Sequence, residues 1–131
     1  MRISKKSQYG LRSMVYLAKK SSKDNPCSIN EISKKENVPF EFLGKIMSEL
    51  EKANLVKTKK GVSGGYFLAK SANKITPGDI VLALEENTEL VNCSGCPMAG
   101  SCSSEDVWDE VQESMDNSLN AKTLADLIKR K

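Results

Sequence analysis

Histidine is absent from this 131-residue sequence, and aromatic side chains make up only 5% of it. Without an imidazole, the chain can supply neither the general base of the commonest hydrolases nor a histidine ligand to a metal. It also lacks a run of about 18 apolar residues that could cross a bilayer, and its first ten residues lack the apolar stretch of a secretory signal. These absences predict a cytoplasmic protein that has no membrane partner.

The charged residues are divided unevenly along the chain. Residues 1–74 hold 16 Lys and Arg against 6 Asp and Glu, a charge of +10, whereas residues 75–131 hold 4 against 11, a charge of −7. Concentrated lysines favour a polyanionic partner such as nucleic acid, and an ordinary solvated surface is the alternative. The length suits one small domain, in which we expect a basic N-terminal part and an acidic C-terminal part.

Three helices are predicted in the basic part. Residues 7–20 place their apolar side chains on one helical face. Ser28 has a glutamate three residues further on, the pattern of a capping box, and opens a short second helix that ends near Asn37. Pro39 is expected in the first turn of a third helix, which continues to about Ala53.

A β-hairpin is predicted next, because two short apolar and basic stretches, 55–60 and 66–69, flank a glycine-rich turn. Helix, helix, helix and hairpin is the order of a winged helix-turn-helix. We therefore expect a mostly α-helical fold with a small β-hairpin. In this fold the third helix enters the major groove of DNA, and the hairpin reaches the minor groove or the backbone.

The candidate DNA contacts come from these two elements. On the third helix they are polar or small residues that avoid the apolar face, and a generic helical core with a solvated face is the alternative reading. Phe40 fits neither face clearly. On the hairpin they are lysines followed by a glycine, which lets the backbone approach a phosphate. The predicted contacts are Glu41, Gly44, Lys45, Ser48, Lys57, Lys59, Lys60 and Gly61.

The hairpin turn, residues 61–65, also fits the G-x-S-x-G pattern of a hydrolase nucleophile elbow. That elbow precedes a helix and needs a histidine elsewhere, whereas a strand is predicted here and histidine is absent. The turn also lacks the Gly-Lys-Ser or Gly-Lys-Thr ending of a phosphate-binding loop. We therefore expect no enzyme.

Three of the four cysteines lie within ten residues: Cys93, Cys96 and Cys102. The glycines and proline between them disfavour helix and strand, so the segment can fold around one centre. Clustered thiolates in a reducing compartment favour an iron–sulfur cluster, with zinc, a dithiol switch and an inert surface loop as alternatives. Cys27 is distant in sequence and is expected to be a small buried apolar side chain.

Helices are predicted again in the acidic part. Thr76 and Pro77 open one, Ser104 opens a long amphipathic one, and residues 123–129 form a last short one. The apolar side chains of the long helix form either a core face or a dimerisation seam. We favour the seam, because DNA-binding dimers read two half-sites. Its residues are Val107, Trp108, Val111, Met115 and Leu119.

Three stretches of this sequence resemble the Rrf2 family of bacterial winged-helix regulators, and together they span essentially the whole chain. They are Met1–Ser4 with the Tyr-Gly-Leu that follows, residues 55–66 with their Gly-Gly-Tyr, and the cysteine loop before a Trp-containing helix. The resemblance implies a homodimeric transcription factor, usually a repressor, that binds double-stranded DNA. It divides the chain into a DNA-binding domain, 1–74, and a sensor loop with dimerisation helices, 75–131.

The resemblance also implies a two-iron or four-iron cluster that controls DNA affinity. The IscR-like branch has a histidine just after the third cysteine, where this chain has Glu105, and the NsrR-like branch takes an acidic ligand from a position occupied here by Gln8. Glu105 is therefore the candidate fourth ligand beside the three cysteines. Gly44 stands at the acidic base-reading position of the IscR-like branch, so the same operator is not expected. The alternative is a cluster-free regulator, as in the CymR-like branch, controlled by thiol oxidation or a protein partner.

Overall fold

The computed structural model describes residues 2–93 and 95–129. It confirms a mostly helical winged helix-turn-helix with a two-stranded antiparallel hairpin. No helix in these two ranges is long and apolar enough to span a membrane. The elements are α1 (Lys5–Lys20), α2 (Ile29–Glu36), α3 (Phe40–Lys52), β1 (Val56–Lys59), β2 (Gly65–Leu68), the short 3-10 helix η1 (Ala72–Lys74), α4 (Pro77–Leu84), α5 (Glu105–Asn120) and α6 (Leu124–Lys129).

The helix limits follow from local capping chemistry. The Ser28 hydroxyl accepts a hydrogen bond from the backbone N–H of Glu31, and α2 ends at Asn37 in the left-handed conformation. Thr76 caps α4 in a complete capping box. Pro39 is the N-cap of α3, one position before its predicted place, because its backbone is extended while its carbonyl accepts the first helical hydrogen bond.

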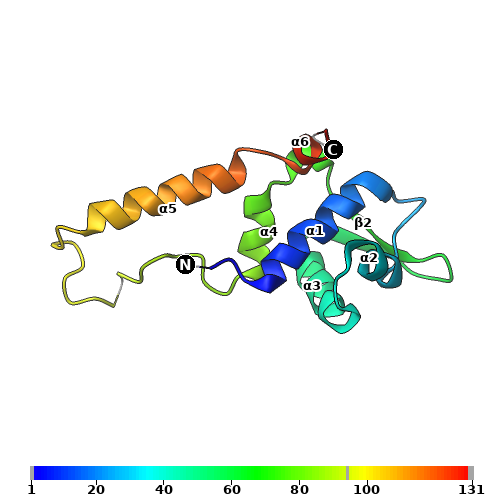
Figure 1. Cartoon of the computed structure of the whole chain (residues 1–131), viewed down its shortest axis with the longest axis horizontal. Coiled ribbons are helices and arrows are strands. Elements are labelled where there is room, and N and C mark those ends of the chain that lie inside the picture. The colour runs from blue at the N-terminus through cyan, green and yellow to red at the C-terminus, as the bar shows by residue number, and fades with distance from the viewer. Residues whose placement is uncertain (1, 94, 130–131) are drawn as a thin grey trace.

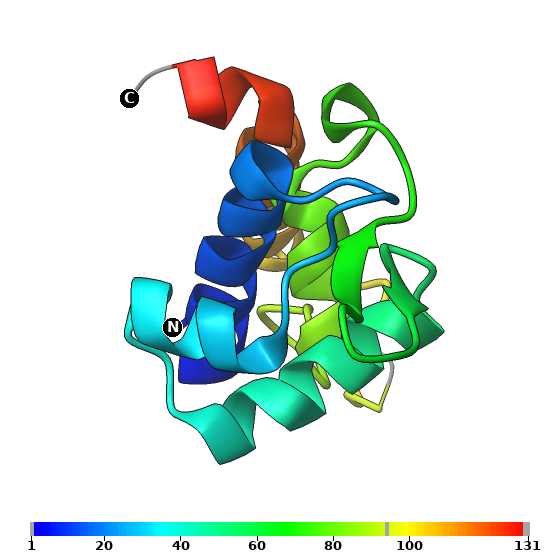
Figure 2. The ribbon, with the colours of Figure 1, turned by 90° about the vertical axis from the view of Figure 1, so that its right-hand side faces the viewer.

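The core forms around α1, which packs against α2, α3, α4, α6 and β2. Figure 2 shows α3 crossing the lower end of α1, with α2 above one end of α3 and the hairpin above the other. A Cβ atom at Gly10 would overlap the Leu84 side chain, so this glycine lets α1 and α4 pack closely. The fully buried side chains include Met14, Leu17, Ile32, Leu43, Ile46, Met47, Leu50, Ile75, Ile80 and Leu124.

The hairpin is tied to the helices by Cys27. The backbone N–H of Cys27 donates to the Tyr66 carbonyl at 2.9 Å, and the Tyr66 N–H donates back at 2.7 Å. A Cβ atom at Gly65 would overlap the Cys27 carbonyl, and one at Gly64 would overlap the Lys59 carbonyl. Glycine is therefore required at these two positions, because another part of the backbone passes too close to leave room for a side chain. Cys27 itself is 2% exposed, which confirms its predicted burial.

The second half of the chain includes an arm. In Figure 1, α5 and the loop before it extend to one side of the body, while α6 returns to the body beside α1. Leu124 is fully buried, and its N–H donates to the Ile75 carbonyl at 2.9 Å. The two helices that flank the arm, α4 before it and α6 after it, thus belong to the same core as the helix-turn-helix.

Candidate nucleic-acid interface and cysteine loop

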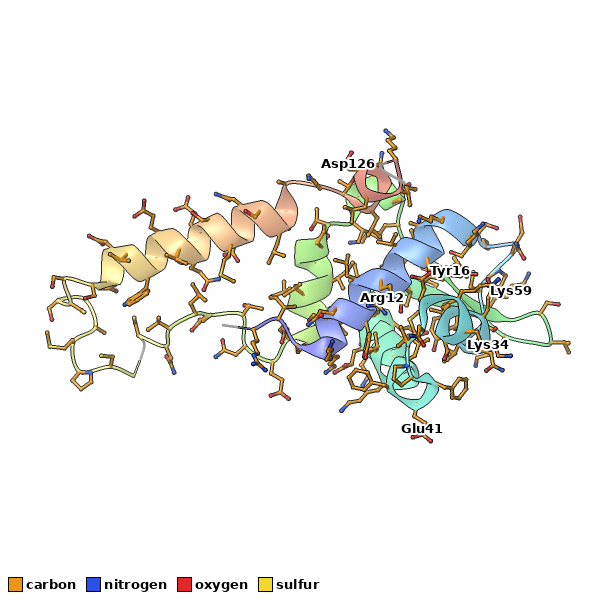
Figure 3. The ribbon with its side chains drawn as sticks, viewed as in Figure 1. Arg12, Tyr16, Lys34, Glu41, Lys59 and Asp126 are labelled. Atoms are coloured by element: carbon orange, nitrogen blue, oxygen red, sulfur yellow. The ribbon has the colours of Figure 1, made fainter. Side chains whose placement is uncertain are left out.

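One side of α3 is buried and the other faces solvent. The apolar side chains at positions 43, 46, 47 and 50 are fully buried. On the opposite side Glu41, Lys45 and Ser48 are exposed, and Gly44 is partly exposed. Figure 3 shows the Glu41 side chain pointing away from the body. All four residues predicted on this helix therefore lie on its accessible side.

Helix α1 holds both helices of the helix-turn-helix unit. The ammonium of Lys6 lies 2.8 Å from each carboxylate oxygen of Glu49 on α3. The ring of Tyr9 meets Phe42 edge to face at 5.6 Å. The Arg12 guanidinium lies over the same Tyr9 ring, 5.5 Å from its centroid, and donates to the carbonyl of Glu36, the last residue of α2, at 3.0 Å. Helix α3 is thus positioned by polar and aromatic contacts as well as by the core.

Basic side chains flank the accessible face of α3. Lys57, Lys59 and Lys60 are exposed on the hairpin, and Gly61 after them has φ +117° with open space around it. Lys34 and Lys35 end α2 and are also exposed. Figure 3 shows Lys34 and Lys59 at the end of the molecule opposite the α5 arm. Lys34 and Lys35 were not among the DNA contacts predicted from the sequence. They could have been included, because the helix preceding a recognition helix commonly crosses the DNA backbone.

The cysteine loop connects α4 to α5. Cys93 and Cys102 are half-buried and Cys96 is exposed. Consecutive turns fold the segment: the Cys96 N–H donates to the Cys93 carbonyl at 3.1 Å, and the Glu105 N–H donates to the Cys102 carbonyl at 3.2 Å. Desolvation, and then the negative charge of Glu105, raise the pKa of Cys93, with smaller contributions from the other two thiols. The Cys93 thiol therefore lies close enough to the other three candidate ligands to respond to their charge.

The donor set suits an iron–sulfur cluster by its chemistry, because thiolates are the usual ligands and a carboxylate oxygen can complete the set. Within residues 2–93 and 95–129, however, no three His, Cys, Asp or Glu side chains are arranged to hold a metal ion. The three cysteines and Glu105 thus lie in one short segment, but their side chains do not surround a common metal position in this structure.

The segment between α4 and the first cysteine is hydrogen-bonded to two other parts of the chain. The Glu85 carboxylate accepts from the Ser4 N–H at 2.8 Å. Burial would raise the pKa of Glu85, but the hydrogen bonds from Ser4 and the charge of Lys6 hold it below its ordinary value. Further along, Gln112 of α5 accepts from the Leu90 N–H at 2.8 Å and donates to the Thr88 carbonyl at 3.0 Å. The segment before Cys93 is therefore bound to both α1 and α5.

Helix α5 has no buried residue within this chain. Val107 and Trp108 are 53% and 44% exposed, and Val111 is half-exposed. Met115 and Leu119 line a groove of about 610 Å³ between α4, α5 and the N-terminal segment, and a shallower one of about 340 Å³ continues along α5. No α5 side chain belongs to the hydrophobic core or packs against it among the residues that the structure describes, so the seam is at most partly covered within the single chain.

Comparisons with known proteins agree with this architecture. The model of the Rrf2 family, described as iron-dependent transcriptional regulators, matches residues 3–130. Protein rrf2 of Nitratidesulfovibrio vulgaris is 35% identical over 98% of this chain and 88% of its own length. The regulator IscR of Yersinia pestis is 30% identical over 98% of this chain and 79% of its own length.

Two solved structures are similar over nearly the whole chain. The structure of CymR, the global cysteine regulator of B. subtilis, covers 100% of this chain and 98% of its own, with a TM-score of 0.84 and 31% identity. The structure of IscR of T. potens covers 99% of this chain and 88% of its own, with a TM-score of 0.81 and 30% identity.

Proposed function

Because this chain belongs to the Rrf2 family of DNA-binding transcriptional regulators, we propose that it binds a specific duplex as a homodimer whose affinity is set by an iron–sulfur cluster. The family consists of regulators and not of enzymes, as the sequence predicts. In this proposal residues 1–74 contact DNA, and residues 75–131 supply the sensor loop and the dimerisation helices.

One observation supports the DNA contact above the others. The residues on the accessible side of α3 are polar or small, whereas the apolar residues on its opposite side are fully buried. Glu41, Gly44, Lys45 and Ser48 would face the base edges in the major groove. The hairpin lysines and Gly61 would contact phosphates. Each lysine–phosphate contact should add about −0.9 to the slope of log affinity against log salt concentration.

A salt titration with a competing duplex tests this contact. Lys60→Ala should weaken binding to all duplexes and lower the steepness of the salt dependence, whereas Lys45→Ala should change sequence preference more than salt dependence. An affinity that does not change with salt concentration would contradict the proposed interface.

The homodimer is supported by the apolar seam of α5, in which Val107 and Trp108 are exposed and Val111, Met115 and Leu119 are partly exposed. A second copy of this helix presents an apolar surface of the same kind, and an interface repeated by two-fold symmetry suits paired half-sites. Sedimentation at micromolar concentration should give a dimer, and a monomer there would contradict this part of the proposal.

The cluster would be held by Cys93, Cys96 and Cys102, with Glu105 as the fourth ligand. When bound, such a cluster supplies a centre whose oxidation or loss responds to the chemistry of the cell. The chain's own contribution is mechanical: Glu85 fastens the start of the loop to α1, and Gln112 fastens it to α5. A tenfold change in DNA affinity needs only about 1.4 kcal/mol of difference between two loop states, the size of a few altered contacts.

The second candidate is a regulator of the same fold without a cluster, governed by thiol oxidation or a protein partner. The similarity to CymR over the whole chain supports it. Anaerobic purification followed by absorption spectroscopy and iron and sulfide analysis separates the two candidates. A brown protein that contains iron and sulfide supports the cluster, and a colourless metal-free protein supports the alternative.

A further inference from the structure

Phe40 is a large apolar side chain exposed at the start of the proposed recognition helix. It is the first residue of α3 and is 53% exposed. The apolar residues that follow it along α3 pack inside the protein: Phe42 contacts Tyr9, and Leu43 is fully buried. The buried core and the side chains packed against it, as far as the structure describes them, do not include Phe40. Its ring is therefore available to a partner.

Phe40 shares one row of the helix surface with the residues proposed to face DNA. Phe40, Gly44 and Ser48 are spaced four residues apart, so they follow one another along α3. A Cβ atom at Gly44 would meet nothing within 4 Å. The surface at Gly44, one helical turn after Phe40, is thus left open by the protein itself, and a base edge can approach the helix backbone there.

The major groove offers one apolar group on an unmodified base, the 5-methyl group of thymine, and phenylalanine is among the side chains that contact it. The N-terminal residues of a recognition helix are those that reach base edges. We propose that Phe40 reads a pyrimidine 5-methyl group in each half-site. This inference rests on the proposed function, since it requires α3 to lie in the major groove.

The consequence is a sequence preference that depends on a methyl group instead of a hydrogen bond. Removing the methyl, by uracil in place of thymine, leaves base pairing and every donor and acceptor of the groove unchanged. Adding it to cytosine restores the apolar contact on a different base. Burying one methyl group contributes ~0.8 kcal/mol, which is about a fourfold change in affinity per half-site.

The test uses the full-length protein and begins by selecting its binding site from a pool of random duplexes. Each thymine of the selected site is then replaced singly by uracil. At one position per half-site the parent protein should lose about fourfold in affinity, whereas Phe40→Ser should bind the thymine and uracil duplexes equally. At that position the parent should also prefer 5-methylcytosine to cytosine.

Val62→Ser is the matched control, because Val62 is fully exposed at the tip of the hairpin and the substitution also removes an exposed apolar side chain. This variant should keep the uracil effect. Equal uracil effects in the parent and in Phe40→Ser, or no sensitive thymine at all, would overturn the inference while leaving the DNA-binding proposal intact. Failure to select any site would overturn the proposed function, and the inference with it.

Discussion

The ammonium nitrogen of Lys6 lies 2.8 Å from both carboxylate oxygens of Glu49, joining the first turn of α1 to the recognition helix α3. The charge of Lys6 also helps to lower the pKa of Glu85, the residue that ends α4 and precedes the cysteine loop. One cation therefore influences two carboxylates, one on the proposed recognition helix and one at the start of the proposed sensor segment.

Lys6→Met tests that relationship. The side chains of Lys6 and Glu49 are 19% and 29% exposed, so solvent screening limits the loss of stability to about 0.5–1 kcal/mol. We expect DNA affinity to fall further than in Lys70→Met, which removes the same charge from an exposed residue outside the helix-turn-helix. Urea unfolding and a binding titration measure the two effects. Equal DNA affinities for the two variants would contradict a positioning role for Lys6.

Gly44→Ala should separate stability from function. A Cβ atom at Gly44 has open space, and replacing a helical glycine by alanine stabilises a protein by about 0.4–1 kcal/mol. The same methyl group would stand between α3 and the base edges, so DNA affinity should fall.

Gly10→Ala is the control for this substitution, because the added Cβ would overlap Leu84 and should lower the melting temperature. Thermal unfolding of both variants, with a binding titration of Gly44→Ala, checks the pair. A destabilised Gly44→Ala, or one with undiminished DNA affinity, would show that Gly44 does not provide close approach.

Cys27 should remain protonated and unreactive while the protein is folded. Burial and a hydrogen bond to Glu31 raise the pKa of the Cys27 thiol from 9.0 to about 12. Iodoacetamide at neutral to mildly alkaline pH should therefore modify thiols of the 93–102 segment but reach Cys27 only after unfolding, as peptide mass spectrometry would show. Modification of Cys27 in the folded protein would contradict this account of its burial.

The same raised pKa sets the sign of a pH effect. The unfolded chain loses the Cys27 proton near pH 9.0 and the folded chain only near pH 12. The contribution of this thiol to stability is thus present below pH 9.0 and is lost as the pH rises toward about 12. Cys27→Ala should unfold with a shallower decline in stability across that window, and an unchanged decline would assign the effect to other groups.

Val107→Glu should convert the proposed dimer to a monomer. Val107 is 53% exposed in the single chain, so the substitution should leave the helical content unchanged while placing a carboxylate in the apolar seam. Sedimentation should show the dimer dissociation constant rise by at least about tenfold. Asn117→Glu adds the same charge at an exposed position outside the seam and should remain dimeric. Equal dissociation constants would place the interface elsewhere.

Much of the fold follows from local chemistry that a sequence displays. Ser28, Asn37 and Thr76 fix helix ends through bonds to neighbours within three or four residues, so the predicted limits agree with the structure to within a few residues. The hairpin position was also predictable, since glycines and alternating strands mark it. The reason why Gly64 and Gly65 must be glycines was not predictable, because it depends on the Lys59 and Cys27 carbonyl groups, which come close only in the folded chain.

The candidate site was less predictable where it depends on long-range contacts. Lys6 and Glu49 are 43 residues apart and show no periodic signal. Phe40 stands at the start of a helix, where too few turns precede it for spacing to assign a face. The α5 seam has the same apolar pattern whether it meets its own core or a second chain, so the sequence alone could not tell that none of its residues is fully buried in the single chain.

The measurement that tests the central claim most directly is the DNA affinity of the anaerobically purified protein before and after its cluster is removed, made in parallel on Cys93→Ser, Cys96→Ser, Cys102→Ser and Cys27→Ser. We predict that the parent and Cys27→Ser contain iron and sulfide and change DNA affinity by about tenfold or more on cluster loss. The other three variants should lack most of the iron and stay at the cluster-free affinity. If those three variants kept the iron content of the parent and its response to oxidant, the proposal of a cysteine-ligated sensor would be contradicted.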